Sequence, residues 1–195
     1  MLSFAAVRTL TRFLLDVEAD ADDLGWGHPP LLLLVQDRPA PSATTSTRRQ
    51  MRAVQLPLRA ARVGRYRAGL PDFLTDLATA LRTDRPLGRP TLAACVDLGL
   101  IVDLVAEPLP GLRLVAWAIC YEDVLVAPDD LREVRRVDAV DADGRGYRIT
   151  RVRGEQRPVV AIDEQSDDRD EPTRTGLTTL IGATTRRDPQ PPRTP

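Results

Sequence analysis

The stretch VRRVDAVDADGRGYRITRV, residues 134–152, decides the fold class of this chain. β-Branched and aromatic residues are frequent in residues 134–141 and 146–152, which is typical of strands, and Asp143-Gly144 between them is a common turn sequence of β-hairpins. We therefore predict an antiparallel hairpin here. Such a hairpin favours an antiparallel or mixed sheet over a regular βαβ repeat.

Further strands are expected on both sides of this hairpin. The continuous apolar run at residues 31–35 predicts a buried strand, since turn-rich sequence precedes it. Residues 112–121 predict a central strand, which residues 124–126 continue after a bulge or a turn. The other elements expected are a strand at 53–58, a short helical turn that starts at 128–130, and a strand at 158–162.

Two helices are predicted from apolar periodicity. In residues 3–24 apolar side chains recur at alternating three- and four-residue steps, so that they share one face; they are Val7, Leu10, Leu14, Val17, Ala21 and Leu24. Ser3 is a suitable N-cap and Gly25 a suitable stop, and we expect this face to pack on a core rather than to form a coiled coil. Residues 71–82 predict a second helix, while residues 91–105 fit a helix or a strand, with their length in favour of a helix.

Together these elements predict an α+β fold with an antiparallel or mixed sheet of about five to six strands packed against two to three helices. One domain is expected over residues 1–163, with a flexible loop at about 36–52 that is rich in Pro, Ser and Thr. Residues 164–195 are expected to form a disordered tail, because an acidic stretch is followed by Thr, Arg and Pro with one small apolar island at 177–181.

Two stretches resemble a known group of proteins. Leu24-Gly25-Trp26 with Pro29-Pro30-Leu31 is similar to the opening of small uncharacterised actinobacterial α+β proteins, in which an N-terminal helix leads through such a turn into a strand. The stretch from residue 136 to Tyr147, with residues 151–154, is similar to a hairpin of the same group. The resemblance implies a small α+β domain, and it implies no catalytic residue.

Composition and cysteine content indicate the cellular compartment of the protein. The 195 residues contain 27 basic residues, all of them Arg, and 28 acidic residues. Cys95 and Cys120 are far apart and outside any metal-binding spacing, so we expect no disulfide and a reducing, cytoplasmic compartment. Two arginines interrupt the first apolar run, which argues against a signal peptide, and the run at 31–35 is too short to span a bilayer, so no membrane association is expected.

The sharpest functional feature is a basic segment. Residues 38–71 contain eight Arg and no acidic residue. A flexible basic segment is able to neutralise phosphates or carboxylates, and an aromatic side chain within it is able to stack on a base. The candidate polyanion- or partner-binding residues are Arg48, Arg49, Arg52, Arg59, Arg62, Arg65, Arg67 and Tyr66. The plainer alternative is a solvated loop, or a loop that pairs with the chain's own acidic stretch.

Motifs for catalysis are weak. Glu122 and Asp123 follow an apolar strand and, with Asp97 or Asp103, would have to converge to hold a metal ion. His28 is the only histidine, and no nucleophile motif stands beside a serine or a cysteine. The acidic hairpin tip departs from a calcium-binding loop, since Val152 falls where a bidentate Glu is needed. We therefore predict no metal site, no cofactor and no catalytic residue.

We interpret the chain as a non-enzymatic accessory or regulatory protein that binds a protein partner or a polyanion through the basic segment, with a protein partner favoured over nucleic acid. Two alternatives stay open. One is a small metal-dependent hydrolase or nuclease that uses clustered carboxylates. The other is a homodimeric structural module, joined through the N-terminal helix or an exposed sheet edge.

Overall fold

The computed structural model describes residues 1–39, 49–83, 89–106, 111–127, 130–163 and 172–185. In chain order the elements are α1 (Phe4–Leu24), β1 (Leu31–Pro39), β2 (Arg49–Pro57), α2 (Ala60–Val63), α3 (Leu70–Leu81), α4 (Pro90–Ala93), α5 (Leu98–Ala106), β3 (Arg113–Ala127), β4 (Asp130–Asp141), β5 (Gly146–Val152), β6 (Val159–Asp163) and α6 (Pro172–Thr185).

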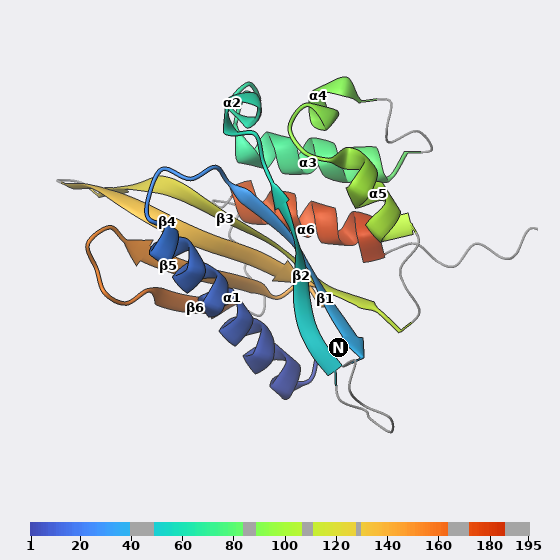
Figure 1. Ribbon diagram of the computed structural model, residues 1–195, viewed down its shortest axis with the longest axis horizontal. Helices are drawn as coiled ribbons and strands as arrows, with labels where there is room; N and C mark the ends of the chain where they lie inside the picture. Colours follow the sequence, from blue (N-terminus) through green and yellow to red (C-terminus); the bar gives the residue numbers. More distant parts are fainter. Residues whose placement is uncertain (40–48, 84–88, 107–110, 128–129, 164–171, 186–195) are drawn as a thin grey trace, which may run out of the picture.

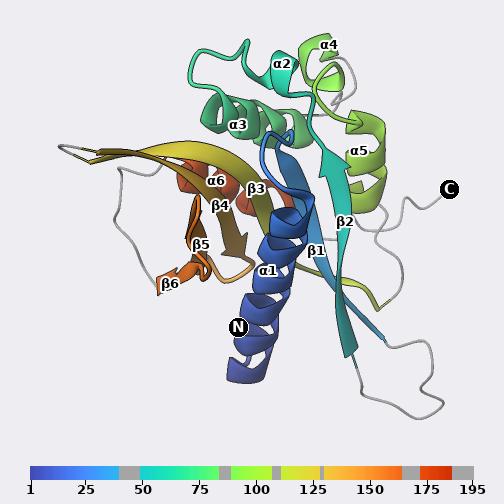
Figure 2. The same cartoon turned by 60° about the vertical axis from the view of Figure 1, so that its left-hand side comes forward.

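The strands form one six-stranded sheet in the order β2-β1-β3-β4-β5-β6, and every neighbouring pair is antiparallel. Figures 1 and 2 show α1 lying against one face of the sheet, while α3, α6 and the shorter helices cover the other face. The predicted α+β fold is thus confirmed, as is the hairpin of β4 and β5. Strands β2 and β6 are the two edges of the sheet.

The apolar run of β1 is buried because both faces of this strand are covered. Leu32 and Leu34 belong to a core cluster with α3, α5 and α6, whereas Leu33 and Val35 belong to a second cluster with α1. All four side chains are at most 1% exposed. The prediction of a buried strand from a continuous apolar run is confirmed, since only a strand covered on both faces needs apolar residues at consecutive positions.

Helix α1 begins and ends as its sequence predicts. The Ala6 amide donates to the Ser3 Oγ at 3.2 Å, and Gly25, with φ of 93°, ends the helix. Leu10 and Leu14 are fully buried against the sheet. The expected helix at 71–82 corresponds to α3.

Residues 172–185 correct the prediction of a disordered tail, because they form the helix α6. Leu177, Leu180 and Ile181 are buried at 0%, 0% and 5% exposure. Gly176 lets α6 approach α3 closely, since a Cβ there would lie 2.8 Å from the Cβ of Leu74. The small apolar island therefore suffices for folding because α3 and the sheet supply the rest of the apolar contact. Residues 164–171 and 186–195 lie outside the described residues.

Three other expectations need correction. The loop expected at 36–52 is shorter, because residues 36–39 extend β1 and residues 49–52 begin β2; residues 40–48 lie outside the described part. Strand β3 runs without interruption to residue 127 against β4, so no bulge or turn separates residues 121 and 124. Asp130 begins β4 instead of a helical turn, while residues 128–129 lie outside the described part.

Residues 91–105 are helical, as their length suggests, but they form two helices. Residues 94–97 separate α4 from α5. The Asp97 side chain accepts a hydrogen bond from the Leu100 amide at 3.0 Å and so caps the start of α5. No helix in the described part of the chain is both long enough and apolar enough to cross a membrane.

Candidate functional site at the end of helix α1

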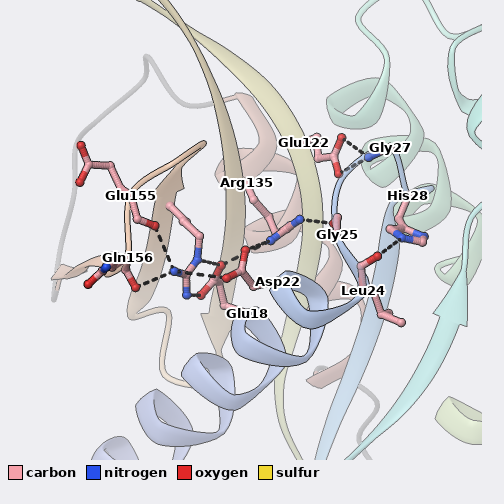
Figure 3. A network of polar contacts seen from close by, with 11 residues as sticks. Glu18, Asp22, Leu24, Gly25, Gly27, His28, Glu122, Arg135, Glu155 and Gln156 are labelled. Carbon is pink, nitrogen blue, oxygen red and sulfur yellow. Dashed lines mark hydrogen bonds and ion pairs between the residues drawn. The ribbon is translucent and has the colours of Figure 1, made fainter.

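A buried ionic network joins α1 to the sheet. Arg151 of β5 binds Glu18 of α1 through two hydrogen bonds of 2.6 Å, and Arg135 of β4 donates to the Asp22 carboxylate at 3.0 Å and to the Gly25 carbonyl (Figure 3). Glu18 is 0% and Arg135 2% exposed. Two cations thus meet two anions, which offsets the cost of burying charge and fixes the last turns of α1 on β4 and β5.

The turn that follows α1 is held by polar and aromatic contacts. The Gly27 amide donates to both carboxylate oxygens of Glu122, at 2.8 and 3.0 Å, and His28 Nε2 lies 3.0 Å from the Leu24 carbonyl (Figure 3). The guanidinium of Arg135 lies 4.5 Å from the centroid of the Trp26 ring, within the range of a cation–π contact. These contacts hold residues 24–28 as one wall of a cavity.

The cavity has a volume of about 180 Å³. Its lining is mainly apolar and comes from α1, the turn after it, β1, the end of β2 and β3: Ala21, Leu24, Pro29, Leu31, Pro57 and Cys120. Glu122 and Arg135 also line it, but their charged groups are already bound to Gly27, Asp22 and Gly25. An apolar cavity of about 150 Å³ holds one benzene-sized molecule. The cavity is therefore the size of one large apolar side chain.

An exposed apolar strip continues from the cavity along the same face of the sheet. Because side chains alternate along a strand, Val124 and Val126 share the face of Glu122, and Val126 pairs directly with Leu131 of β4. Val124, Val126 and Leu131 are 48%, 75% and 71% exposed. Figure 1 shows β3 and β4 running past the helices toward the end of the sheet that carries these residues. Contiguous exposed apolar residues of this kind mark interaction surfaces.

The described candidate arginines of the predicted basic segment lie partly on the edge strand β2 and partly in the residues that follow it. Arg49 begins β2 and pairs with Asp37, whereas Arg59 follows the strand and donates to the Ala94 carbonyl at 3.0 Å. A strand rises about 3.3 Å per residue, so these two arginines are separated by roughly 25 Å or more. Arg52 donates to Gln50 at 3.2 Å, and Arg48 lies outside the described residues.

Tyr66 has partners within the chain for both its ring and its hydroxyl. Its ring packs edge to face on Phe73, with the centroids 5.9 Å apart, and its hydroxyl donates to Asp76 at 3.0 Å. Burial, and then the contact with Asp76, raise the pKa of Tyr66 above its usual range. Arg62, Arg65 and Arg67 are exposed, and within the described residues no hydrogen bond or ion pair engages their side chains. They are the part of the predicted segment that remains open to a partner.

The carboxylates considered for a metal site do not converge. Adjacent residues of a strand point to opposite faces, so Glu122 reaches Gly27 beside α1 whereas Asp123 pairs with Arg136 at 3.2 Å on the other face. In the part of the chain that the structure describes, no three His, Cys, Asp or Glu side chains are grouped to hold a metal ion. The hydrolase alternative would therefore need carboxylates from outside the described residues to complete a cluster.

Both cysteines are poor candidates for a nucleophile. Cys95 is 1% and Cys120 8% exposed, and neither forms a disulfide. Burial raises the pKa of Cys120 to about 11 and also raises that of Cys95. At neutral pH both groups therefore remain thiols, which are far less nucleophilic than thiolates.

A second, more polar hollow of about 620 Å³ lies between the starts of α3 and α6 and strands β3 to β5. Its arginines are paired with acids. Arg136 binds Asp123 at 3.2 Å, although the buried Nε of Arg136 has no hydrogen-bond partner among the described residues. Arg148 donates at 2.9 Å to Asp138, which lies outside the lining, and the Tyr121 hydroxyl donates to the same carboxylate at 2.7 Å. Burial and Asp138 together raise the pKa of Tyr121 above its usual range. This mutual pairing leaves the first, apolar cavity as the better candidate site.

Comparisons of the chain with protein-family models, with curated proteins and with solved structures returned no match. The function is therefore argued from the geometry.

Sequence reasoning missed the cavity, although one signal pointed to it. Glu18 stands among the apolar positions of the first helix, four residues after Leu14 and three before Ala21. Arg135 alternates with Val137 and Ala139 on the face of the hairpin that turns inward. An acid and a base on two inward faces of packed elements indicate a buried ion pair, which here forms one side of the cavity.

Proposed function

We propose that the protein is a non-enzymatic accessory protein that binds a protein partner on the face of the sheet that carries α1. The proposal rests on the cavity, which is apolar, open and the size of one large side chain. Pockets of this kind hold the anchor residues of protein interfaces. The apolar strip of Val124, Val126 and Leu131 extends the same surface. The separated carboxylates and the buried thiols support a binding role over catalysis.

Filling the cavity is expected to abolish partner binding. Ala21 lines the cavity, so an Ala21→Phe side chain would occupy the space of the partner's anchor residue. Peptides selected from a displayed random library on the full-length protein should share one Leu, Ile, Met or Phe anchor. We expect their affinity for the Ala21→Phe variant to fall at least about tenfold, in line with the loss of one anchor contact.

The matched control is Ala19→Phe, which places the same ring on an exposed position of the same helix. The selected peptides should bind the Ala19→Phe variant as tightly as they bind the unmodified protein. Circular dichroism should show that both variants keep the fold. Peptides that bind the Ala21→Phe variant with full affinity would contradict the proposed site.

A second candidate function is contact with an anionic group through Arg62, Arg65 and Arg67. The observation in its favour is that all three are exposed and their side chains are not engaged within the described residues. Charges that are free of intramolecular partners interact with polyanions in a strongly salt-dependent way.

Replacing these three arginines by serine is expected to lower the salt concentration at which the protein elutes from a heparin column. The control is a variant with Arg8, Arg12 and Arg113 changed to serine, which alters the net charge equally at exposed sites outside the segment. Equal elution shifts for the two variants would mean that retention follows net charge alone, and this second function would then be abandoned.

A further inference from the structure

The edge strand β6 is the least protected part of the sheet. All five of its residues are exposed, with Val159 at 69%, Val160 at 40% and Ile162 at 41%. One side of β6 pairs with β5, and no other described strand pairs with its second side. An apolar edge with unpaired backbone groups is a template for pairing with another strand.

The opposite edge strand, β2, is polar where β6 is apolar, and this difference affects pairing with other chains. Strand β2 carries charged or polar residues and a proline along its length, namely Arg49, Gln50, Arg52, Gln55 and Pro57. Such residues on an edge oppose pairing with other chains. In β6 the first four residues are Val, Val, Ala and Ile, and Asp163 is the only charged one. The two edges thus behave differently, with one protected against pairing and the other open to it.

We propose that β6 of one copy pairs antiparallel with β6 of a second copy around a two-fold axis at Ala161, so that the two sheets become continuous. This surface is distinct from the cavity, and the inference does not depend on the proposed function. In this register Val160 of one copy lies opposite Ile162 of the other, and this pair occurs twice. Both side chains lie on the α1 face, since their partners in β5 are the buried residues Ile149 and Tyr147.

Charge complementarity favours a second copy as the occupant. In the same register Asp163 lies opposite Val159 of the other copy, and Arg157 precedes that residue by two positions. Arg157 lies in the bend that precedes β6. Diagonal neighbours across an antiparallel pair are about 7–8 Å apart, so extension of the strand by two residues on pairing would bring Arg157 within reach of Asp163. Arg157 is exposed and has no ion-pair partner within the described residues. Asp163 pairs with Arg174 of its own chain at 3.0 Å through one carboxylate oxygen, but its side chain stays 56% exposed and is able to accept a second arginine. Two ion pairs between Arg157 and Asp163 would then flank the apolar centre.

Light scattering and sedimentation of the full chain are expected to give the mass of a dimer. Ala161→Lys places two like charges opposite each other on the axis, and Val160→Lys removes the apolar pair; each is expected to shift the protein to a monomer. The control is Gln55→Lys on the β2 edge, which should remain dimeric. All three positions are exposed or partly exposed on strands, and circular dichroism checks that the fold is kept.

A cysteine scan tests the register. With a two-fold axis at residue 161, Ala161→Cys brings two thiols to directly opposite positions, whereas the thiols of Val159→Cys are offset by four residues, or about 13 Å. Disulfide-linked dimer should form at least about tenfold faster for Ala161→Cys, and the buried native cysteines serve as the internal background. A monomeric wild-type chain, a dimeric Ala161→Lys variant or equal cross-linking at both positions would each overturn the proposal.

Discussion

Replacing Glu18 by alanine is expected to lower the free energy of unfolding by about 3–5 kcal/mol, because the change leaves buried cations without their counterion. Glu18 binds Arg151 through two hydrogen bonds and lies 3.8 Å from Arg135. Asp22, at 39% side-chain exposure, is the only other acid of the network and cannot neutralise both guanidinium groups. Urea unfolding followed by circular dichroism measures the loss.

The matched control is Asp20→Ala, which removes an exposed acid from the same helix and is expected to change stability by less than about 0.5 kcal/mol. The double variant Glu18→Leu, Arg151→Met separates two explanations. A buried ion pair replaced by apolar residues of similar size is often neutral, so we expect this variant to recover much of the stability that Glu18→Ala loses. An equal loss in the Asp20 and Glu18 variants would show that the network does not stabilise the fold.

The same network explains why the cavity keeps its shape. Arg135 donates to the Gly25 carbonyl and stacks on Trp26, so that the ion pairs of α1 also fix the turn that closes the cavity. The ionic network therefore also holds one wall of the cavity. Mutation of the network should weaken peptide binding together with stability, whereas Ala21→Phe should weaken binding alone.

The parts of the fold that the sequence predicts are those decided by local pattern. The hairpin of β4 and β5 follows from alternation around Asp143-Gly144, and α1 follows from apolar periodicity with Ser3 as its cap. The run at residues 31–35 predicts β1 because burial on both faces requires consecutive apolar residues. In each case the signal lies within about twenty residues of sequence.

The candidate site depends on contacts that sequence order hides. Glu18 and Arg151 are 133 residues apart in the chain, and the cavity joins five separate elements. Conversely, Arg49 and Arg59 are close in sequence but distant in space, because the extended strand β2 separates them. Proximity in the sequence therefore does not bring Arg49 and Arg59 together, and separation in the sequence concealed the network.

Helix α6 was missed because its own residues are poor indicators of a helix. It contains six threonines and two glycines, residues of low helix propensity, and only a short apolar island. The structure compensates in two ways. Threonine hydroxyls donate to carbonyls one turn earlier, for example Thr178 to Arg174 at 3.0 Å, and Gly176 allows close packing against Leu74. Tertiary contact thus overrides a weak local preference.

A chain shortened to residues 1–163 is accordingly expected not to fold cooperatively. Leu177, Leu180 and Ile181 are almost fully buried, and each such side chain contributes about 1.5–3 kcal/mol by its removal from water. Removal of α6 would also expose Trp117, whose indole nitrogen donates to Thr184 at 3.2 Å, and the face of α3 that packs on α6. This loss is comparable with the whole stability of a typical domain, about 5–15 kcal/mol.

The control is a chain that ends at residue 185, which keeps every described contact and is expected to unfold at the same temperature as the full chain. Thermal unfolding followed by far- and near-ultraviolet circular dichroism distinguishes the two shortened chains. A point variant tests the same interface without truncation: Gly176→Val would force a Cβ to within 2.8 Å of Leu74 and should lower the melting temperature. If the chain of residues 1–163 keeps its near-ultraviolet signal and a sharp unfolding transition, the prediction is wrong. The fold then does not need α6, and Trp117 is buried without this helix.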